Sequence, residues 1–440
     1  MTTFKKVKRF ILRSLILLIA LLVLAGAILL GPALWRHWVS YPDLEKARAE
    51  IWAQYQPVRN FTDKTDYKGV LHAHCFWSHD SRGVLAEILP AAKKAKLDFI
   101  FFSDHIRNEQ DTFPRALHGV YDHIVLESGT ETRGLMVSPM RDTVIDWHTA
   151  TGEVIKEVVR SGGFVGYVHS EEDHEWDNPF YQAMEIYNIH TDLLDEDKNF
   201  LLSMILNALV NGRKYRHWVY RELFDAQTEI LRHWDALNDS RQIVGFAAVD
   251  AHHNQGIRAR YTDDGRVEWV GPNAKTIKKT DPGWKEKWLL HEPNETGWAF
   301  QWDLDTYFAS FNYVNNHVLC DTLTDRNIMD NLIKGHVYIS FESLAEARGF
   351  QFFSQDKDGI VNAIMGDSLK IDLADKLTAL SPFPVKFTLL KNGVIIDEQK
   401  DVYTYEYRPG LQAGRYRIEA SLFLAREWVP WVCTNPIYLY

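Results

Sequence analysis

Metal-binding side chains crowd into one short segment of this chain. Three His and one Asp fall between Leu71 and Ser81, directly after an apolar lead-in that reads as a strand. Successive side chains of a strand point to opposite faces, so His72 and His74 share a face and can bind one metal ion together. The segment therefore predicts a metal site at the end of a strand.

Further apolar runs along the chain end in the same way. The side chains at their ends are Asp104 and His105, Glu131, His169, His190, and Asp250 and His252. In parallel α/β barrels the active site lies at the carboxyl ends of the strands, so these side chains are expected to converge. Imidazoles and carboxylates suit zinc, manganese or iron, and grouping them is costly unless they are paired or bound to metal. The series predicts a metal centre in a parallel α/β core.

The order of these motifs over residues 66–342 resembles the polymerase-and-histidinol-phosphatase (PHP) superfamily of metallohydrolases. The motifs are His-x-His, Ser-x-Asp-Ser, Asp-His, Gly-x-Glu, His and Asp-x-His. The resemblance implies an α/β fold with a distorted parallel (β/α)7-type barrel, and two or three divalent ions (Zn, Mn or Fe) as cofactors. The tail Trp431–Tyr438 further resembles the carbaryl-hydrolase-like branch of the superfamily.

The resemblance also implies a role for each ligand. One ion is held by His72, His74, Glu131 and Asp250. A second ion is held by Glu131, which bridges the two, together with His105 and His169. Asp80 and His252 belong to a third position or lie around it. His190 stands where some members have a further ligand, and Asn188 matches that position equally well.

Other residues are expected to assist the chemistry. Asp80 and His252 are predicted to handle protons. Asp104 is predicted to take a catalytic part by orienting His105, with capping of a helix as the alternative. Substrate contacts are predicted for Arg133, Asn188, Arg258 and Arg260, since the three arginines lie close in sequence to ligand positions and could hold phosphate oxygens.

The predicted activity is metal-dependent hydrolysis of a small-molecule substrate. A metal-activated water suits a phosphoester, which makes a phosphoesterase the first hypothesis. The alternative is a carbamate, ester or amide hydrolase with the same metals. A third hypothesis is a membrane-tethered binding protein that has lost activity, against which the intact ligand series counts. The formal charge of −10 argues against nucleic-acid binding.

The N-terminal segment predicts a membrane anchor. No charged residue occurs from Ser14 to Trp35, and Leu15–Leu34 is as long as a bilayer core requires. Five Lys and Arg residues precede this stretch, which predicts a cytoplasmic N-terminus and a catalytic body on the other side, periplasmic in a Gram-negative cell. Ala25-Gly26-Ala27 resembles a signal-peptidase site, but the apolar run continues beyond it, so an uncleaved single-pass anchor in the cell membrane is preferred.

Four parts are expected along the chain. They are the basic stub and anchor at 1–35, a stem at 36–65, a metallohydrolase domain at 66–345 and a β-sandwich domain at 346–440. The last is expected to be of immunoglobulin type, because short alternating segments follow Gly349 and Asn392-Gly393 predicts a hairpin turn.

Within the metallohydrolase domain, apolar periodicity predicts helices at 84–96, 151–160 and 324–334, and a strand at 337–341. Residues 196–237 are expected to form a long helical stretch, and the Gly- and Pro-rich stretch 256–298 an irregular insertion.

Overall fold

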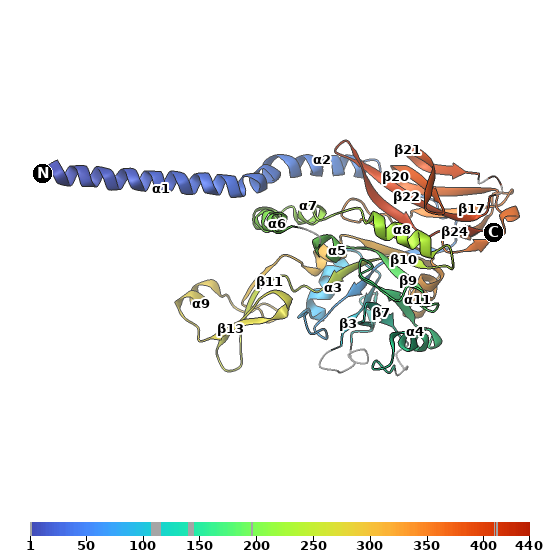
Figure 1. The fold of residues 1–440 in the computed structure, drawn as a ribbon, viewed down its shortest axis with the longest axis horizontal. Coiled ribbons are helices and arrows are strands. Elements are labelled where there is room, and N and C mark those ends of the chain that lie inside the picture. Colours follow the sequence, from blue (N-terminus) through green and yellow to red (C-terminus); the bar gives the residue numbers. More distant parts are fainter. Residues whose placement is uncertain (1, 107–115, 140–144, 195–196, 409, 411) are drawn as a thin grey trace.

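The computed structural model describes residues 2–106, 116–139, 145–194, 197–408, 410 and 412–440. It is a mixed α/β protein in which one long helix extends away from the body (Figure 1). The C-terminal strands lie at the opposite end of the molecule from the N-terminus (Figure 1).

Helix α1 (Thr2–Trp35) is long and apolar enough to span a membrane, as predicted. Its apolar stretch is exposed along its length. A π-helical turn, η1 (Arg36–Ser40), and helix α2 (Tyr41–Trp52) follow without a break. The stem is therefore helical to Trp52, and the remaining residues up to β1 are extended or turn. Membrane insertion, and its direction, stay predictions.

A ring of strand pairings holds the predicted metal site. Its strands are β1 (Thr65–Ala73), β2 (Phe99–Phe102), β3 (Asp104–His105), β5 (Ile124–Glu127), β6 (Thr130–Thr132), β7 (Leu135–Ser138), β8 (Phe164–Tyr167), β9 (Ala183–Asn188) and β10 (Val244–Ala251). The pairings run from β1 to β2, through β2–β5 and β3–β6 to β7, and through β8, β9 and β10 back to β1. All are parallel except those of β7. The carboxyl ends of most of these strands consequently meet at one edge.

The interior of these strands is apolar on both faces. Leu71, Phe99 and Phe101 belong to one buried cluster, whereas Val70, Ile100 and Phe102 belong to another. Alternate residues of one strand thus enter different clusters, which is typical of strands buried on both sides. This burial fixes the strand register, because a slip of one residue would exchange the two faces.

The expected helices form close to the predicted bounds. They are α3 (Leu85–Lys94), α4 (Thr151–Arg160) and α11 (Asp325–Lys334), and the strand β16 (Val337–Ser340) follows α11. The side chain of Thr324 accepts a hydrogen bond from the Asn327 amide and so caps α11. The long helical stretch is instead broken into α6 (Lys198–Asn211), α7 (Arg216–Arg221) and α8 (Thr228–Leu237), after the short α5 (Ile189–Leu194).

The prediction of an irregular insertion at 256–298 is wrong. These residues, with 299–303, form an antiparallel sheet of β11 (Gly256–Tyr261), β12 (Val267–Val270), β13 (Thr276–Thr280) and β14 (Phe300–Asp303), with helix α9 (Trp284–Leu289) and the 3-10 turn η3 (Pro272–Ala274). A small core of Ala259, Val267, Leu290 and Ala299 supports the sheet. The strands of this sheet are short, and the Gly and Pro residues of its turns made their alternation of apolar and polar residues difficult to recognise in the sequence. We call residues 256–303 the insertion sheet.

The C-terminal part is built of antiparallel strands apart from one parallel pair. They are β17 (Gln351–Gln355), β18 (Val361–Ile364), β19 (Ser368–Leu369), β20 (Lys376–Lys391), β21 (Val394–Tyr407), β22 (Gly414–Leu424), β23 (Glu427–Thr434) and β24 (Ile437–Leu439), with the turn η4 (Ile371–Leu373). Asn392 and Gly393 both have positive φ, so the predicted hairpin turn between β20 and β21 is present. The immunoglobulin-type arrangement and the domain boundaries stay predictions.

A buried ionic network joins β1 to β15 (Asn315–Cys320) and to the segment that follows β16. Asp66 Oδ1 at the start of β1 lies 2.7 Å from His317 Nδ1 on β15, and His317 Nε2 lies 3.3 Å from Glu342 Oε1. Glu342 also accepts from Lys68 Nζ at 3.0 Å and from the Ala347 amide at 2.8 Å. Burial would raise the pKa of Glu342, but the Lys68 and His317 charges hold it at about 2.

Glu342→Gln is expected to lower the free energy of unfolding by about 3–5 kcal/mol at neutral pH, because Lys68 is left buried without its counter-charge. The Glu342 pKa is lowered by folding, so its stabilisation is present above pH 4.5 and is lost as the pH falls toward about 2. The difference between wild type and variant in urea unfolding should shrink over that range. The exposed Glu229→Gln is the control, and a difference independent of pH would contradict the assignment.

Candidate metal centre

The ends of β1 and β10 carry their ligands on an irregular backbone. His72 has φ of 59° and Asp250 has φ of 42°, and the pairings of β1 shift register between Leu71 and Ala73. The prediction of a regular strand with simple alternation is therefore wrong at His72. Left-handed backbone at non-glycine residues costs on the order of 1 kcal/mol or more, and such strain is common at functional sites.

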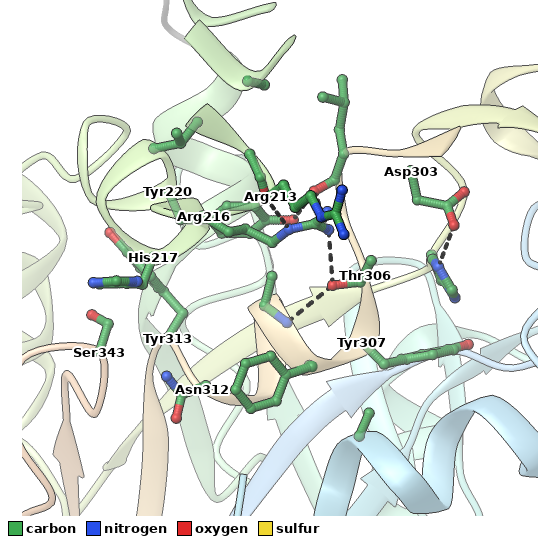
Figure 2. A pocket seen from close by; sticks show the side chains of 18 of the residues that line it. Arg213, Arg216, His217, Tyr220, Asp303, Thr306, Tyr307, Asn312, Tyr313 and Ser343 are labelled. Carbon is green, nitrogen blue, oxygen red and sulfur yellow. Dashed lines mark hydrogen bonds and ion pairs between the residues drawn. The ribbon is translucent and has the colours of Figure 1, made fainter. Parts of the chain in front are cut away.

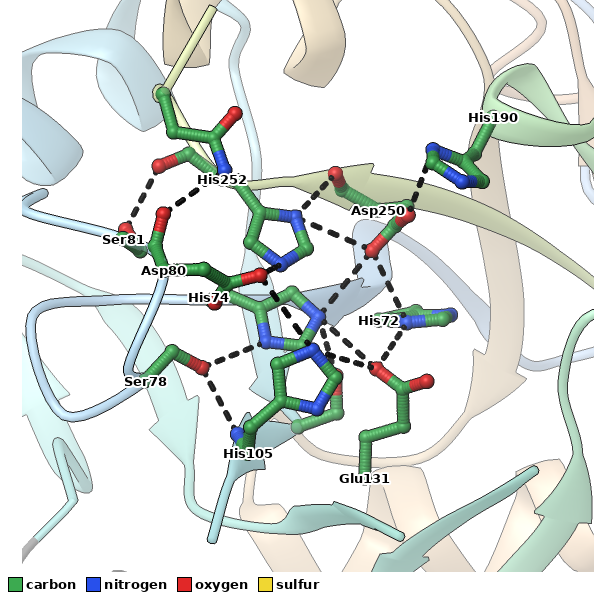
Figure 3. A network of polar contacts seen from close by, with 12 residues as sticks. His72, His74, Ser78, Asp80, Ser81, His105, Glu131, His190, Asp250 and His252 are labelled. Carbon is green, nitrogen blue, oxygen red and sulfur yellow. Dashed lines mark hydrogen bonds and ion pairs between the residues drawn. The ribbon is translucent and has the colours of Figure 1, made fainter. Parts of the chain in front are cut away.

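Four side chains form the first group of converging donors. The Nε2 atoms of His72 and His74 both lie 3.2 Å from Asp250 Oδ1, and 3.0 and 3.3 Å from Glu131 Oε2 (Figure 3). One donor atom from each of the four lies within 4.8 Å of all the others. All four side chains are buried or nearly so. Two imidazoles and two carboxylates in this arrangement suit one divalent ion.

The surroundings of these donors fit a metal ion better than a hydrogen-bonded cluster. Asp250 Oδ1 is buried and accepts no hydrogen bond, although two imidazole nitrogens lie close to it. The far nitrogens are engaged, since His72 Nδ1 lies 3.2 Å from Glu185 Oε2 and His74 Nδ1 lies 2.9 Å from Ser78 Oγ. An imidazole that donates from one nitrogen presents a lone pair at the other, which is the form a metal binds.

A second group of donors adjoins the first. It comprises His74, His105 and His252, whose ring nitrogens also lie within 4.8 Å of one another. Asp80 Oδ2 lies 3.1 Å from His252 Nε2 and 3.7 Å from His105 Nε2 (Figure 3). Glu131 reaches both groups, because its Oε2 also lies 3.6 Å from His105 Nε2. Its other oxygen, Oε1, lies 3.3 Å from His169 Nε2. The centre is thus compatible with divalent metal binding at more than one position.

The buried carboxylates and imidazoles of the centre strongly shift one another's pKa values. Burial would lower the pKa of His72, but the Glu131 and Asp250 carboxylates raise it well above its usual range. His169 behaves likewise, with burial opposed by Glu131 and Glu171 and a pKa of about 11. Burial and the neighbouring His74 instead lower the pKa of His105 to about 4. Divalent cations would satisfy the buried carboxylates in place of these protons, so protons and metal compete for the site.

His190 and Asn188 take different places at the edge of the centre. His190 Nδ1 lies 3.4 Å from Asp250 Oδ2, on a side chain that is 40% exposed. The side-chain oxygen Oδ1 of Asn188 accepts a hydrogen bond from the His190 backbone amide at 2.8 Å, and Asn188 is buried. The structure thus brings His190 up to the donors, whereas Asn188 supports the turn that carries it.

The three arginines expected to hold phosphate are engaged by other groups. Arg258 Nε donates to Asp303 Oδ1 at 2.9 Å, and Arg260 Nε donates to Glu268 Oε2 at 2.8 Å. Arg133 donates to the backbone carbonyls of Trp147 and Thr149. Phosphate binding by these residues stays a prediction, and it would require them to leave the partners that they have here. The partners of Arg258 and Arg260 lie on other strands of the insertion sheet, which closeness in sequence to the ligands did not indicate.

Asp104 contacts Cys75, the residue that follows the ligand His74. It does not orient His105 or cap a helix. Its Oδ1 accepts from the Cys75 amide at 2.7 Å, and its Oδ2 lies 3.1 Å from Cys75 Sγ. Burial raises the pKa of Asp104. The carboxylate holds the segment just after His74, so a direct catalytic part is not supported by its contacts.

Two residues that hold the histidine ligands in place were not predicted from the sequence. Glu185 lies within the apolar strand β9 and its carboxylate reaches His72. Ser78 Oγ lies 2.9 Å from His74 Nδ1 and accepts the His105 amide at 2.8 Å, so it links two ligands. A charged residue in a fully buried strand was the available signal for Glu185.

Two cavities lie near one another on the helical side of the body. The one of about 580 Å³ is lined by Asp80, His190, Asp250 and His252 of the metal centre. A larger one of about 1010 Å³ is lined by Arg213, Arg216 and His217 among others (Figure 2). None of the converging donors is among the described residues that line the larger cavity. The smaller cavity is therefore the one of the two that borders the converging donors.

Comparisons with known proteins add little beyond the geometry. No family model and no curated protein matches the chain. A similar solved structure is the crystal structure of a two-domain protein containing a predicted PHP-like metal-dependent phosphoesterase from Bacteroides vulgatus ATCC 8482. It is 11% identical, covers 87% of this chain and 98% of its own, and superimposes with a TM-score of 0.37. A likeness this distant carries no argument about family or activity.

Glu185→Gln is expected to weaken metal binding by about 10–100-fold, because the carboxylate that fixes the His72 ring is lost. Metal affinity is measured by competition with a chromophoric chelator on the full chain in detergent. Glu157→Gln, on the exposed face of α4, is the matched control. Unchanged affinity in Glu185→Gln would show that Glu185 does not support a metal ligand.

Proposed function

We propose that this chain is a metal-dependent hydrolase, with a phosphoester as its substrate. The observation that best supports this proposal is that two groups of metal-binding side chains, which share His74, lie together at the ends of the paired strands. We infer further that the ring of pairings is the predicted PHP-type barrel of seven strands, counting β2 with β3 and β5 with β6. A binding protein without activity accounts less well for this many buried ligands.

Each residue of the centre has a part in this proposal. One position is assigned to His72, His74, Glu131 and Asp250, and an adjoining one to Glu131, His105 and His169, with Asp80 and His252 beside them. Bound divalent ions lower the pKa of a water molecule and stabilise the negative charge that develops at the reacting centre. Asp80 and His252 line the cavity and lie 3.1 Å apart, so this pair can hold a proton beside the substrate.

The cavity beside the centre supports a substrate with an apolar portion. Its lining includes Ile189, Leu201, Met204, Ile205, Leu223 and Val249. These side chains come mainly from α5 and α6 and face the acidic and imidazole groups of the centre. An apolar group bound against them would place the bond to be hydrolysed next to Asp80, Asp250 and His252.

The same cavity favours a second candidate, the carbamate, ester or amide hydrolase. No Lys or Arg is among the described residues that line it. Phosphate groups are usually bound by cationic side chains, so their absence from this lining favours a neutral bond. The two candidates differ in substrate and share the same metal chemistry.

We place this activity at the surface of a membrane. Helix α1 supports a single-pass anchor with a cytoplasmic N-terminus and a body on the other side. In that position the substrate is a small molecule available to the extracytoplasmic space.

Purified full-length protein in detergent is expected to hydrolyse a phosphomonoester, a phosphodiester or a carbamate in a chelator-sensitive way. His105→Ala should lower the rate by at least about 100-fold, because metal stabilisation of the reacting charge amounts to several kcal/mol. The exposed His291→Ala is the matched control. Preference for the carbamate would select the second candidate. Metal binding without turnover of any substrate would contradict both.

Ile205→Trp is expected to raise KM about tenfold for a substrate with a bulky apolar group, because the side chain lines the cavity. A small substrate of the same bond type should be affected less. Leu202→Trp, an exposed position on the same helix that does not line the cavity, is the control. Equal effects of the two variants would mean that substrate binds elsewhere.

A further inference from the structure

Two tryptophans of the insertion sheet are unusually exposed. Trp284 and Trp288 on α9 are 76% and 77% exposed, and they lie four residues apart, so they share one face of the helix. Ile277 on the neighbouring β13 is also exposed. The small core of the insertion sheet contains other residues, so these side chains are not required for its packing. Exposed aromatic side chains grouped in this way usually mark a binding surface.

The same surface is positively charged. The segment 275–288 contains Lys275, Lys278, Lys279, Lys285 and Lys287, all exposed, against Asp281 and Glu286. Glu286 is buried, and its carboxylate accepts from the Gly283 amide and lies 3.5 Å from Lys278 Nζ. Lys279 Nζ lies 3.8 Å from Glu268, so two of the five lysines face a carboxylate. The whole chain has a net charge of −10, so this positive segment differs from the rest of the protein. A positive surface is complementary to an anionic partner. We call this set of lysines with Trp284, Trp288 and Ile277 the α9 face.

The α9 face lies at the end of the molecule from which α1 extends. In Figure 1, α9 and β13 lie farther toward the N-terminal end of the long axis than the rest of the body, level with the last part of α1. The base of α1 is fixed to the body, because the Arg36 guanidinium pairs with Glu222 at 2.5 Å and His37 Nδ1 lies 2.8 Å from Asn211 Oδ1.

Two exposed tryptophans indicate where the surface of a bilayer would cross the helix α1. Trp35 and Trp38 are 64% and 74% exposed and directly follow the apolar stretch. Tryptophan gathers at the headgroup level of bilayers, where its ring is partly apolar and its N–H is hydrated. A bilayer that contains the apolar stretch of α1 therefore has its surface near Trp35, and the α9 face lies at the same end of the body (Figure 1).

We propose that the α9 face is a second membrane contact, made with the anionic lipids of the bilayer that α1 crosses. Trp284 and Trp288 enter the headgroup layer, and the lysines bind lipid phosphates. Basic side chains are attracted to an anionic lipid surface, and amphipathic aromatic side chains strengthen the contact. The inference rests on the anchor and on the insertion sheet, so it does not depend on which bond the metal centre hydrolyses.

The test uses the full chain in nanodiscs of brominated phosphatidylcholine, with or without phosphatidylglycerol. Brominated lipid quenches tryptophans that enter the bilayer. Trp35, Trp38, Trp284 and Trp288 are the tryptophans expected there, so Trp284→Ser/Trp288→Ser should remove about half of the quenching in anionic discs. Trp428→Ser, on β23 among the C-terminal strands, is the matched control and should leave the quenching unchanged.

A second variant tests the charge without removing an aromatic side chain. Lys285→Glu/Lys287→Glu should reduce the quenching in anionic discs and have little effect in phosphatidylcholine alone. Equal quenching of wild type and Trp284→Ser/Trp288→Ser in anionic discs would overturn the proposal. Protection of residues 276–290 from hydrogen exchange that rises with protein concentration in detergent would also overturn it, because a second copy of the chain would then cover the α9 face.

Discussion

The convergence of buried carboxylates and imidazoles around Asp250 and Glu131 is the constraint on which the rest of the fold depends. Such groups are costly to bury, and several of their oxygens and nitrogens meet without a complementary donor. Only a rigid surrounding can hold them together. Strands buried on both faces provide that rigidity, and they fix the register at which each strand ends. His72, His169 and Asp250 all have positive φ, so backbone strain is present at three of the residues that carry the ligands.

Much of this arrangement could be predicted because its signals are local. The periodicity of 151–160 is sufficient to define α4, and metal-binding side chains at the ends of apolar runs converge wherever parallel strands lie side by side. The bulge at His72 could not be predicted, because it depends on how β1 pairs with both β2 and β10. The partners of Arg258 were equally hidden, since Asp303 and Glu87 reach it from other elements. Predictions failed where a residue's role depends on a distant partner.

Helix α6 links the anchor to the cavity. Its Asn211 donates to the Ala33 carbonyl near the end of α1 and contacts His37, while its Leu201, Met204 and Ile205 line the cavity beside the metal centre. A single helix therefore contacts the end of α1 and also lines the cavity beside the metal-binding donors.

One anchor alone would leave the body free to turn about the axis of α1. A second contact at the α9 face would restrict that rotation, and it need not be strong. Once α1 is inserted, the α9 face is held near the bilayer at a high effective concentration, so a few weak lysine and tryptophan contacts suffice. Both contacts lie at the same end of the molecule, and the C-terminal strands lie at the other (Figure 1). The cavity lined by α6 would then keep a constant orientation to the membrane.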